Sequence, residues 1–266
     1  MNRGKLKNIV ASMVIIISAI SCEEVIVVDL RSRPPELVVE GFIALDSTSI
    51  VKLSMTTDYF ENTQADPVTG ATIILETDNG ESETLVHRGN GFYTGSSVIG
   101  TTGVTYTIRI NNDGEEIAGY TYLPEPVKII STEGIEPPFG RPDDEPVYII
   151  EVKFTDSPET ENYYMLRFYR NDTIMSESIS LASNAYNSTG TVEYTEWRYE
   201  FSPGDSAVVE VYSIDSALYS YFSMLNEVTS FGINFSTPYN PGSTLSGNTL
   251  GYFGSWSYVS DSTVIK

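Results

Sequence analysis

The chain has 266 residues, of which 36 are acidic and 15 are basic, and its formal net charge at pH 7 is −21. So acidic a protein repels phosphate groups, which excludes nucleic acid as a ligand. Tyr is abundant, with 18 residues, and aromatic and β-branched side chains suit the half-buried surface of a pleated sheet. We therefore expect a mainly β protein that is long enough for two domains.

Residues 1–21 have the layout of a secretory signal peptide. Arg3, Lys5 and Lys7 form a basic start, and an apolar run from Ile9 to Ile20 follows. A run of this length is too short for a stable helix across a hydrocarbon core of roughly 30 Å, which needs about 20 residues. We interpret the segment as a signal peptide that is removed, with a short transmembrane anchor as the alternative.

Cys22 follows this segment and is the only cysteine of the chain, so no disulfide can form within it. With the small residues Ala19 and Ser21 before it, Cys22 resembles the lipobox cysteine of bacterial lipoproteins. That resemblance implies alkylation of its thiol with diacylglycerol, which carries acyl chains such as palmitate, and cleavage that makes Cys22 the first residue of the mature protein. Each buried methylene of an acyl chain contributes about 0.8 kcal/mol to membrane binding. The next residues, Glu23 and Glu24, resemble the surface-export signal of Bacteroidota lipoproteins, which implies an outer-membrane anchor facing the cell exterior.

Residues 22–35 form a short lipidated tether that ends at Pro34-Pro35. Removal of residues 1–21 takes away three basic residues and no acid, which changes the net charge from −21 to −24. A charge of this sign disfavours contact between side chains and anionic lipid, so we expect the protein to be attached to the membrane through its N-terminal lipid.

Short strands separated by turn signals fill residues 36–125, the first predicted domain. The turns contain Asn-Gly or Asp-Gly, which tolerate positive φ, and they lie at residues 78–80, 89–91 and 112–114. The predicted strands cover residues 37–43, 49–55, 72–76, 83–87, 92–93, 105–110 and 116–123. Seven short strands at this spacing predict an immunoglobulin-like or transthyretin-like β-sandwich.

Residues 126–266 form the second predicted domain, which is β-rich with one helix. Pro-rich stretches at 124–126 and 133–146 predict a boundary region around a possible first strand at 127–131. Further strands are predicted at residues 147–154, 163–169, 176–181, 195–201 and 207–213.

An amphipathic helix is predicted near residues 215–229, because Ile214, Leu218 and Phe222 recur at helical spacing. The carboxylate of Asp215 is placed to cap its first free amides. The Gly-rich stretch from residue 237 predicts a loop over the core before a last strand at 256–259.

The acidic run Asp143-Asp144-Glu145 offers oxygen ligands for calcium. Known calcium loops place their acids at alternate positions, whereas these three are adjacent. We therefore interpret the run as a solvated loop, and we predict neither a metal site nor a cofactor.

Sequence signals for catalysis are sparse. His87 is the only histidine, so a Ser-His-Asp triad must include it, and no Gly-x-Ser-x-Gly sequence accompanies it. Zinc sites of the Cys/His type are excluded by count, and no phosphate-binding glycine motif is present. Paired carboxylates of the kind that cleave glycosides cannot be placed from sequence. We predict that the protein is not an enzyme.

Aromatic side chains that stack on a sugar or nucleobase are the best candidates for ligand binding. The candidates are Tyr163, Tyr164, Trp197, Tyr199, Tyr252 and Trp256. Each of them also fits the alternative of ordinary core packing or cross-strand pairing.

Several short segments together resemble a Bacteroidota lipoprotein family known as a domain of unknown function. They are residues 35–41, 67–71, 154–156, 162–164, 204–205, 211–215 and 250–254, with Gly247-Asn248 where the family often has Gly-Gly. Members are often encoded beside TonB-dependent outer-membrane receptors. The resemblance implies an accessory or binding component of a nutrient-uptake system. The alternatives are a structural or adhesive surface module and a hydrolase that acts on a surface polymer.

Overall fold

The computed structural model describes residues 34–57, 65–138, 146–185, 189–230 and 239–266. Pro35–Lys266 form one compact unit. The predicted signal peptide, the lipidation site Cys22, the acids Glu23 and Glu24, and the acidic run at 143–145 lie outside the described residues. Within the described residues, no helix is long and apolar enough to cross a membrane.

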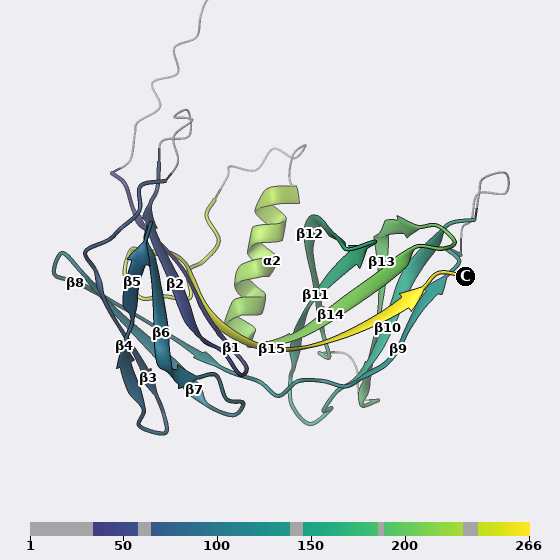
Figure 1. Cartoon of the computed structure of the whole chain (residues 1–266), viewed down its shortest axis with the longest axis horizontal. Coiled ribbons are helices and arrows are strands. Elements are labelled where there is room, and N and C mark those ends of the chain that lie inside the picture. Colours follow the sequence, from purple (N-terminus) through teal and green to yellow (C-terminus); the bar gives the residue numbers. More distant parts are fainter. Residues whose placement is uncertain (1–33, 58–64, 139–145, 186–188, 231–238) are drawn as a thin grey trace, which may run out of the picture. The chain divides into compact units, whose positions relative to one another are not determined.

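The fold is mainly β, as the sequence predicts, and the described residues contain fifteen strands and one helix, α2 (Ser216–Ser230) (Figure 1). The strands are β1 (Leu37–Ala44), β2 (Thr48–Met55), β3 (Thr72–Thr77), β4 (Ser82–Thr84), β5 (Val86–Gly89), β6 (Phe92–Ile99), β7 (Thr105–Asn112), β8 (Glu115–Tyr122), β9 (Ile129–Ile135), β10 (Tyr148–Thr155), β11 (Tyr163–Arg170), β12 (Thr173–Ser183), β13 (Thr191–Phe201), β14 (Ser206–Ile214) and β15 (Leu250–Val264).

Three sheets enclose two main hydrophobic cores. An eight-stranded sheet has the order β12-β11-β14-β15-β1-β2-β6-β5, and the others have the orders β4-β3-β7-β8 and β13-β10-β9. Side chains of β1, β2 and β6 pack with those of β3, β7 and β8 in the first core. Side chains of β11 and β14 pack with those of β10 and β13 in the second. Both cores therefore lie between sheets, as in a β-sandwich.

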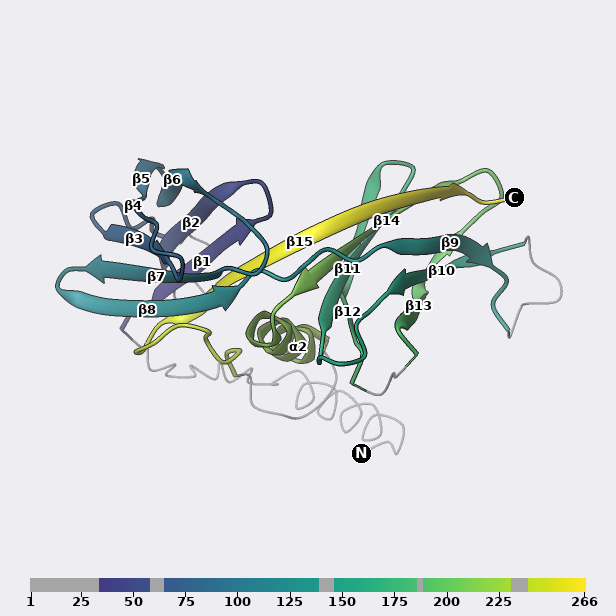
Figure 2. The same ribbon diagram turned by 90° about the horizontal axis from the view of Figure 1, so that it is seen from below.

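Strand β15 belongs to both halves of the eight-stranded sheet (Figures 1 and 2). Its first part pairs in parallel with β1, from Val38 opposite Leu250 to Ala44 opposite Trp256. From Trp256 onward it pairs in antiparallel fashion with β14. Phe253 of β15 belongs to the second predicted domain but packs in the first core. The predicted domain boundary between residues 125 and 126 therefore stays a prediction.

A loop precedes the last strand over the described residues 239–249, but the prediction of that strand at 256–259 was too short, because β15 runs from Leu250 to Val264. Two glycines of this Gly-rich stretch, Gly251 and Gly254, permit close packing within the fold. Gly251 has a φ of +97°, and a Cβ atom there would lie 2.0 Å from the carbonyl oxygen of Val39. At Gly254, a Cβ atom would lie 2.6 Å from the side chain of Leu218.

The prediction of one strand at 83–87 was also wrong. The pairing of β4 with β3 reaches Thr84, and the amide of Leu85 still donates a hydrogen bond to the carbonyl of Ile73. Leu85 itself is buried in the first core and separates β4 from β5. The chain then enters β5, which pairs with β6 in the other sheet. Part of the predicted boundary loop is strand as well, since β9 extends to Ile135.

Helix α2 begins as predicted after Asp215, whose Oδ1 atom accepts a hydrogen bond of 2.8 Å from the amide of Leu218. This is the bond expected of an N-cap residue. The apolar face of α2 packs on Met165 and Tyr212 of the eight-stranded sheet and forms a third, smaller core.

Candidate functional site

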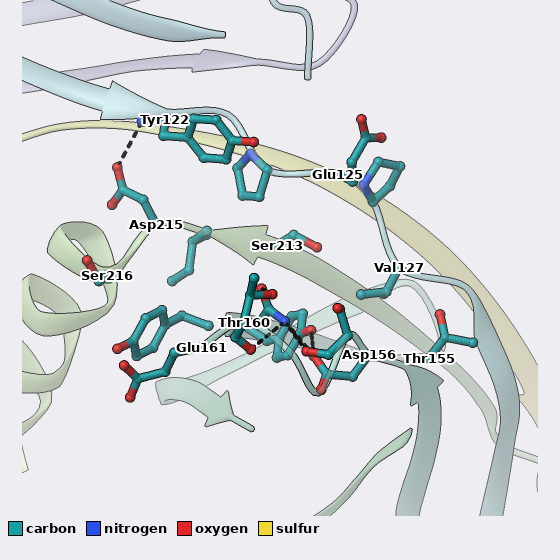
Figure 3. Close-up of a pocket in the computed structure, with 17 residues that line it drawn as sticks. Tyr122, Glu125, Val127, Thr155, Asp156, Thr160, Glu161, Ser213, Asp215 and Ser216 are labelled. Carbon is teal, nitrogen blue, oxygen red and sulfur yellow. Dashed lines mark hydrogen bonds between the residues drawn. The ribbon is translucent and has the colours of Figure 1, made fainter. Parts of the chain in front are cut away.

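A cavity of about 630 Å³ lies where three parts of the chain meet (Figure 3). The first is the connection between β8 and β9, and the second is the loop between β10 and β11 with the start of β11. The third is the end of β14 with the start of α2. Small-molecule sites commonly have volumes of about 300–1,000 Å³, so the cavity has the size of a ligand site.

The loop between β10 and β11 is held by the carboxylate of Asp156. Its Oδ1 atom accepts hydrogen bonds from the hydroxyl of Tyr164 at 2.5 Å and from the side-chain amide of Asn162 at 2.9 Å. Its Oδ2 atom accepts a bond of 2.7 Å from the side-chain amide of Asn184. Burial, and then the Asp156 carboxylate, raise the pKa of Tyr164, so this hydroxyl remains a donor.

Asp215 joins three elements at another side of the cavity. Besides capping α2, it accepts a hydrogen bond of 2.5 Å at Oδ2 from the hydroxyl of Thr121 on β8. The hydroxyl of Thr121 also lies 2.9 Å from that of Ser255 on β15. The amide of Tyr122 donates a further bond of 3.4 Å to Asp215, which Figure 3 draws. Together these bonds fix the end of β8 relative to the start of the helix.

Two further carboxylates, those of Glu125 and Glu161, line the cavity and are exposed. Glu125 accepts a hydrogen bond of 2.6 Å from the hydroxyl of Thr102. Burial, and then the carboxylate of Glu161, raise the pKa of the Tyr163 hydroxyl. The described residues that line the cavity include four carboxylates and no Lys, Arg or His. The cavity is therefore acidic.

Ser213 lines the cavity from β14 and is only 3% exposed. Figure 3 draws it between Glu125 and Asp156. Its hydroxyl has no hydrogen-bond partner among the described residues, and the same holds for Ser257, which lies opposite it on β15. An unsatisfied buried hydroxyl costs about 1–3 kcal/mol, so Ser213 offers an unused hydrogen-bonding group beside the cavity.

The aromatic candidates from the sequence lie in four places. Tyr163 and Tyr164 line the cavity. Tyr252 lines a second, more apolar cavity of about 400 Å³ beside α2. Trp256 stacks on Phe42 with ring centroids 4.4 Å apart.

The other two candidates lie on β13. Trp197 is 58% exposed, in the stretch where the register between β13 and β10 shifts. Tyr199 is 1% exposed and packs near Phe168, so it is a core residue rather than a stacking surface. His87, the only histidine of the chain, does not line the cavity; it is exposed on β5, and its ring centroid lies 4.9 Å from that of Tyr93.

Most of the cavity was not predicted from the sequence. Tyr122, Glu125, Glu161 and Ser213 were not proposed as binding residues, and Asp215 was proposed only as a helix cap. One signal pointed to Ser213 and Asp215, though not to the other three: the segments 154–156, 162–164 and 211–215, which carry the family resemblance, all contribute to this one cavity. Their convergence is visible only in the fold.

The chemistry that this lining supports is binding. It provides carboxylates, hydroxyls, amides and aromatic rings, and none of its described members is a cysteine or histidine. In the part of the chain that the structure describes, no three His, Cys, Asp or Glu side chains gather into a potential metal site. Fold and site together define a mainly β protein with an acidic cavity.

The chain belongs to the family described as domain of unknown function DUF4249, which matches residues 23–262. No curated protein matches it. Among solved structures, it is similar to trypsin-activated alpha-2-macroglobulin from Escherichia coli, with 14% identity and a TM-score of 0.22 over 69% of this chain and 15% of that one. It is also similar to the chicken interferon gamma receptor alpha chain, with 14% identity and a TM-score of 0.19 over 68% and 90% of the two chains. Likeness at these TM-scores is too slight to transfer a fold or a function.

Proposed function

We propose that this protein is a non-catalytic, lipid-anchored component of an outer-membrane nutrient-uptake system that faces the cell exterior and holds a small ligand in the acidic cavity. Its partner in this proposal is a TonB-dependent receptor, to which it passes the ligand. The observation that carries the binding role is the cavity itself, which has the volume of a ligand site and a lining of polar groups and tyrosines.

The proposed location rests on the N-terminal sequence. The single cysteine at position 22, behind a basic and apolar leader, supports lipidation, and Glu23 and Glu24 support export to the surface. The match to the DUF4249 family agrees with the resemblance from which the Bacteroidota origin and the receptor partner are inferred.

Co-isolation from native membranes tests the partnership. The lipidated protein, carrying a C-terminal tag, is purified from detergent-solubilised membranes of cells that also receive labelled palmitate. We expect incorporation of the label and recovery of a β-barrel receptor in near-equal amount. The Cys22→Ser variant is the control, and it should lose the label.

Labelled protein that brings down no receptor contradicts the uptake role. If that same protein binds to cells, the result supports the alternative of a structural or adhesive surface module. The hydrolase alternative rests on the presence of Glu125 and Glu161 in one cavity, because glycoside cleavage uses two carboxylates. A turnover screen on glycans and peptides that stays blank would remove that alternative.

A further inference from the structure

We propose that the ligand of this cavity carries a protonated amine, which the carboxylates of Glu125 and Glu161 and the hydroxyl of Ser213 recognise. This inference rests on the proposed binding function and adds the chemical class of the ligand. It does not depend on the membrane partner.

Charge is the first argument. Glu125, Asp156, Glu161 and Asp215 all line the cavity, and its described lining contains no basic side chain. A cleft lined by charges of one sign focuses the field and concentrates ligands of the opposite sign. An anionic ligand is repelled by this field, and a neutral ligand gains no electrostatic attraction from it.

The four carboxylates differ in what remains available to a ligand. Asp156 already accepts three hydrogen bonds from neighbouring side chains, and Asp215 is occupied by the helix amide and by Thr121. Glu125 accepts a hydrogen bond from Thr102 and Glu161 interacts with the hydroxyl of Tyr163, but both residues are exposed. These two are therefore the acids that a cation in the cavity can approach.

The unpartnered hydroxyl of Ser213 is a second argument, independent of the charge. It is buried, belongs to a residue that lines the cavity, and has no partner among the described residues. An ammonium group has three N–H donors and no acceptor, so it needs several acceptors at once. The oxygen of Ser213, together with a carboxylate, meets that need after a small adjustment of the side chain.

Aromatic rings complete the set. Tyr122, which is 48% exposed, and Tyr163 both line the cavity. A cation is attracted to the face of an aromatic ring, and this attraction strengthens where water is excluded. Carboxylates together with tyrosine rings are suited to an ammonium group, whereas the four carboxylates repel a carboxylate or phosphate ligand.

Calorimetric titration of the soluble protein, residues 23–266, with two charge series tests the inference. The peptide series is N-acetylated Ala-Lys-Ala, Ala-Gln-Ala and Ala-Glu-Ala, each as the C-terminal amide. The sugar series is the trimers of glucosamine, N-acetylglucosamine and galacturonic acid. We expect the cationic member of at least one series to bind about tenfold or more tightly than its neutral counterpart, and the anionic member not to bind. The series that responds identifies the source of the amine.

Variants locate the interaction. Glu161→Gln should weaken binding of the cationic probe about threefold to tenfold, as expected for the loss of one partly exposed charge. Ser213→Ala should weaken it by a similar factor. Glu159→Gln is the matched control, because Glu159 is exposed on the same loop but does not line the cavity, and its affinity should stay within about twofold.

Raising the salt concentration from about 20 mM to about 500 mM should weaken binding to the wild type more than to Glu161→Gln, because salt screens the charge that the variant has lost. Equal affinity for cationic and neutral probes, with no effect of Glu161→Gln, overturns the amine inference and leaves the cavity as a ligand site. Absence of binding by every cationic probe also overturns the inference. Receptor co-isolation then decides the proposed function separately.

Discussion

At the scale of single residues, Glu83 holds the point where the chain passes between sheets. Its carboxylate accepts hydrogen bonds from the backbone amides of Ser96 at 2.8 Å, Ser97 at 3.0 Å and Val98 at 3.1 Å, all on β6. Burial raises the pKa of Glu83, but these amides outweigh it, and the pKa lies below its ordinary value of 4.5. The ionised form is therefore the one that stabilises the fold.

This predicts a pH-dependent effect of the Glu83→Gln substitution. Because the folded-state pKa is the lower one, the stabilisation is complete above the unfolded-state pKa near 4.5 and is lost as the pH falls through the folded-state pKa. We expect Glu83→Gln to lower the free energy of unfolding by about 1–2 kcal/mol at pH 7 and by much less near pH 3. Urea unfolding measures both, with Glu81→Gln in the same hairpin as control. A difference that is constant with pH contradicts this role.

A second residue-scale prediction concerns Asp215. Asp215→Ala removes the helix cap and the bond from Thr121, so we expect a loss of about 1–3 kcal/mol in the free energy of unfolding. Asp215→Asn keeps an acceptor and should lose less, and Ser216→Ala, at an exposed position, should lose little. Equal losses for Asp215→Ala and Ser216→Ala would rule out the capping role.

These residues also explain what the sequence could reveal. The cap at Asp215 was predicted because its partner amide is three residues away, and helix capping follows local rules. Glu83 and the amides that it binds are thirteen to fifteen residues apart. The unpartnered hydroxyl of Ser213 depends on neighbours from several strands. No local pattern encodes such contacts.

At the scale of elements, β15 is the strand whose start was hardest to predict from the sequence. Its Leu-Gly-Tyr-Phe-Gly start has the composition of a loop, since glycine weakens most strands. In the fold, the glycines are required because β1 and α2 approach the strand closely at Gly251 and Gly254. A parallel partner more than two hundred residues away gives no signal in the local sequence.

The close approach at Gly251 is tested by Gly251→Ala, with Gly247→Ala as the matched control. Both glycines have positive φ, but a Cβ atom at position 247 meets nothing closer than 3.9 Å, whereas one at position 251 collides with Val39. We expect a loss of about 3 kcal/mol or more for Gly251→Ala and about 1 kcal/mol for Gly247→Ala, measured by urea unfolding. Hydrogen exchange should accelerate in β1 and β15 for Gly251→Ala alone. Similar losses for the two variants contradict the packing argument.

At the scale of the whole described unit, two cores share one eight-stranded sheet. Because β15 pairs with β1 and with β14, unfolding of either half removes a hydrogen-bonded neighbour from the other. The sequence predicted a mainly β fold and most strand positions, because strand and turn signals are local. It did not predict the sharing of β15, which depends on long-range pairing.

This sharing predicts cooperative unfolding of the two halves, and the two tryptophans of the chain report on it separately. Trp256 stacks on Phe42 of β1, whereas Trp197 lies on β13 of the second core's sheet. The variants Trp197→Phe and Trp256→Phe each keep a single tryptophan. Within each variant, we expect the urea midpoint of tryptophan fluorescence to equal the urea midpoint of circular dichroism. Fluorescence and circular dichroism midpoints that differ within one variant would instead indicate two independent domains.

The central claim is that the acidic cavity binds the ligand, and a variant that fills the cavity tests it most directly. Thr160 is exposed and lines the cavity, whereas Thr173 is exposed at the start of β12 and does not line it. We predict that Thr160→Trp lowers the affinity for the tightest-binding probe of the two charge series at least tenfold in calorimetric titration, and that Thr173→Trp leaves it unchanged. Undiminished affinity in a folded Thr160→Trp protein would contradict the account.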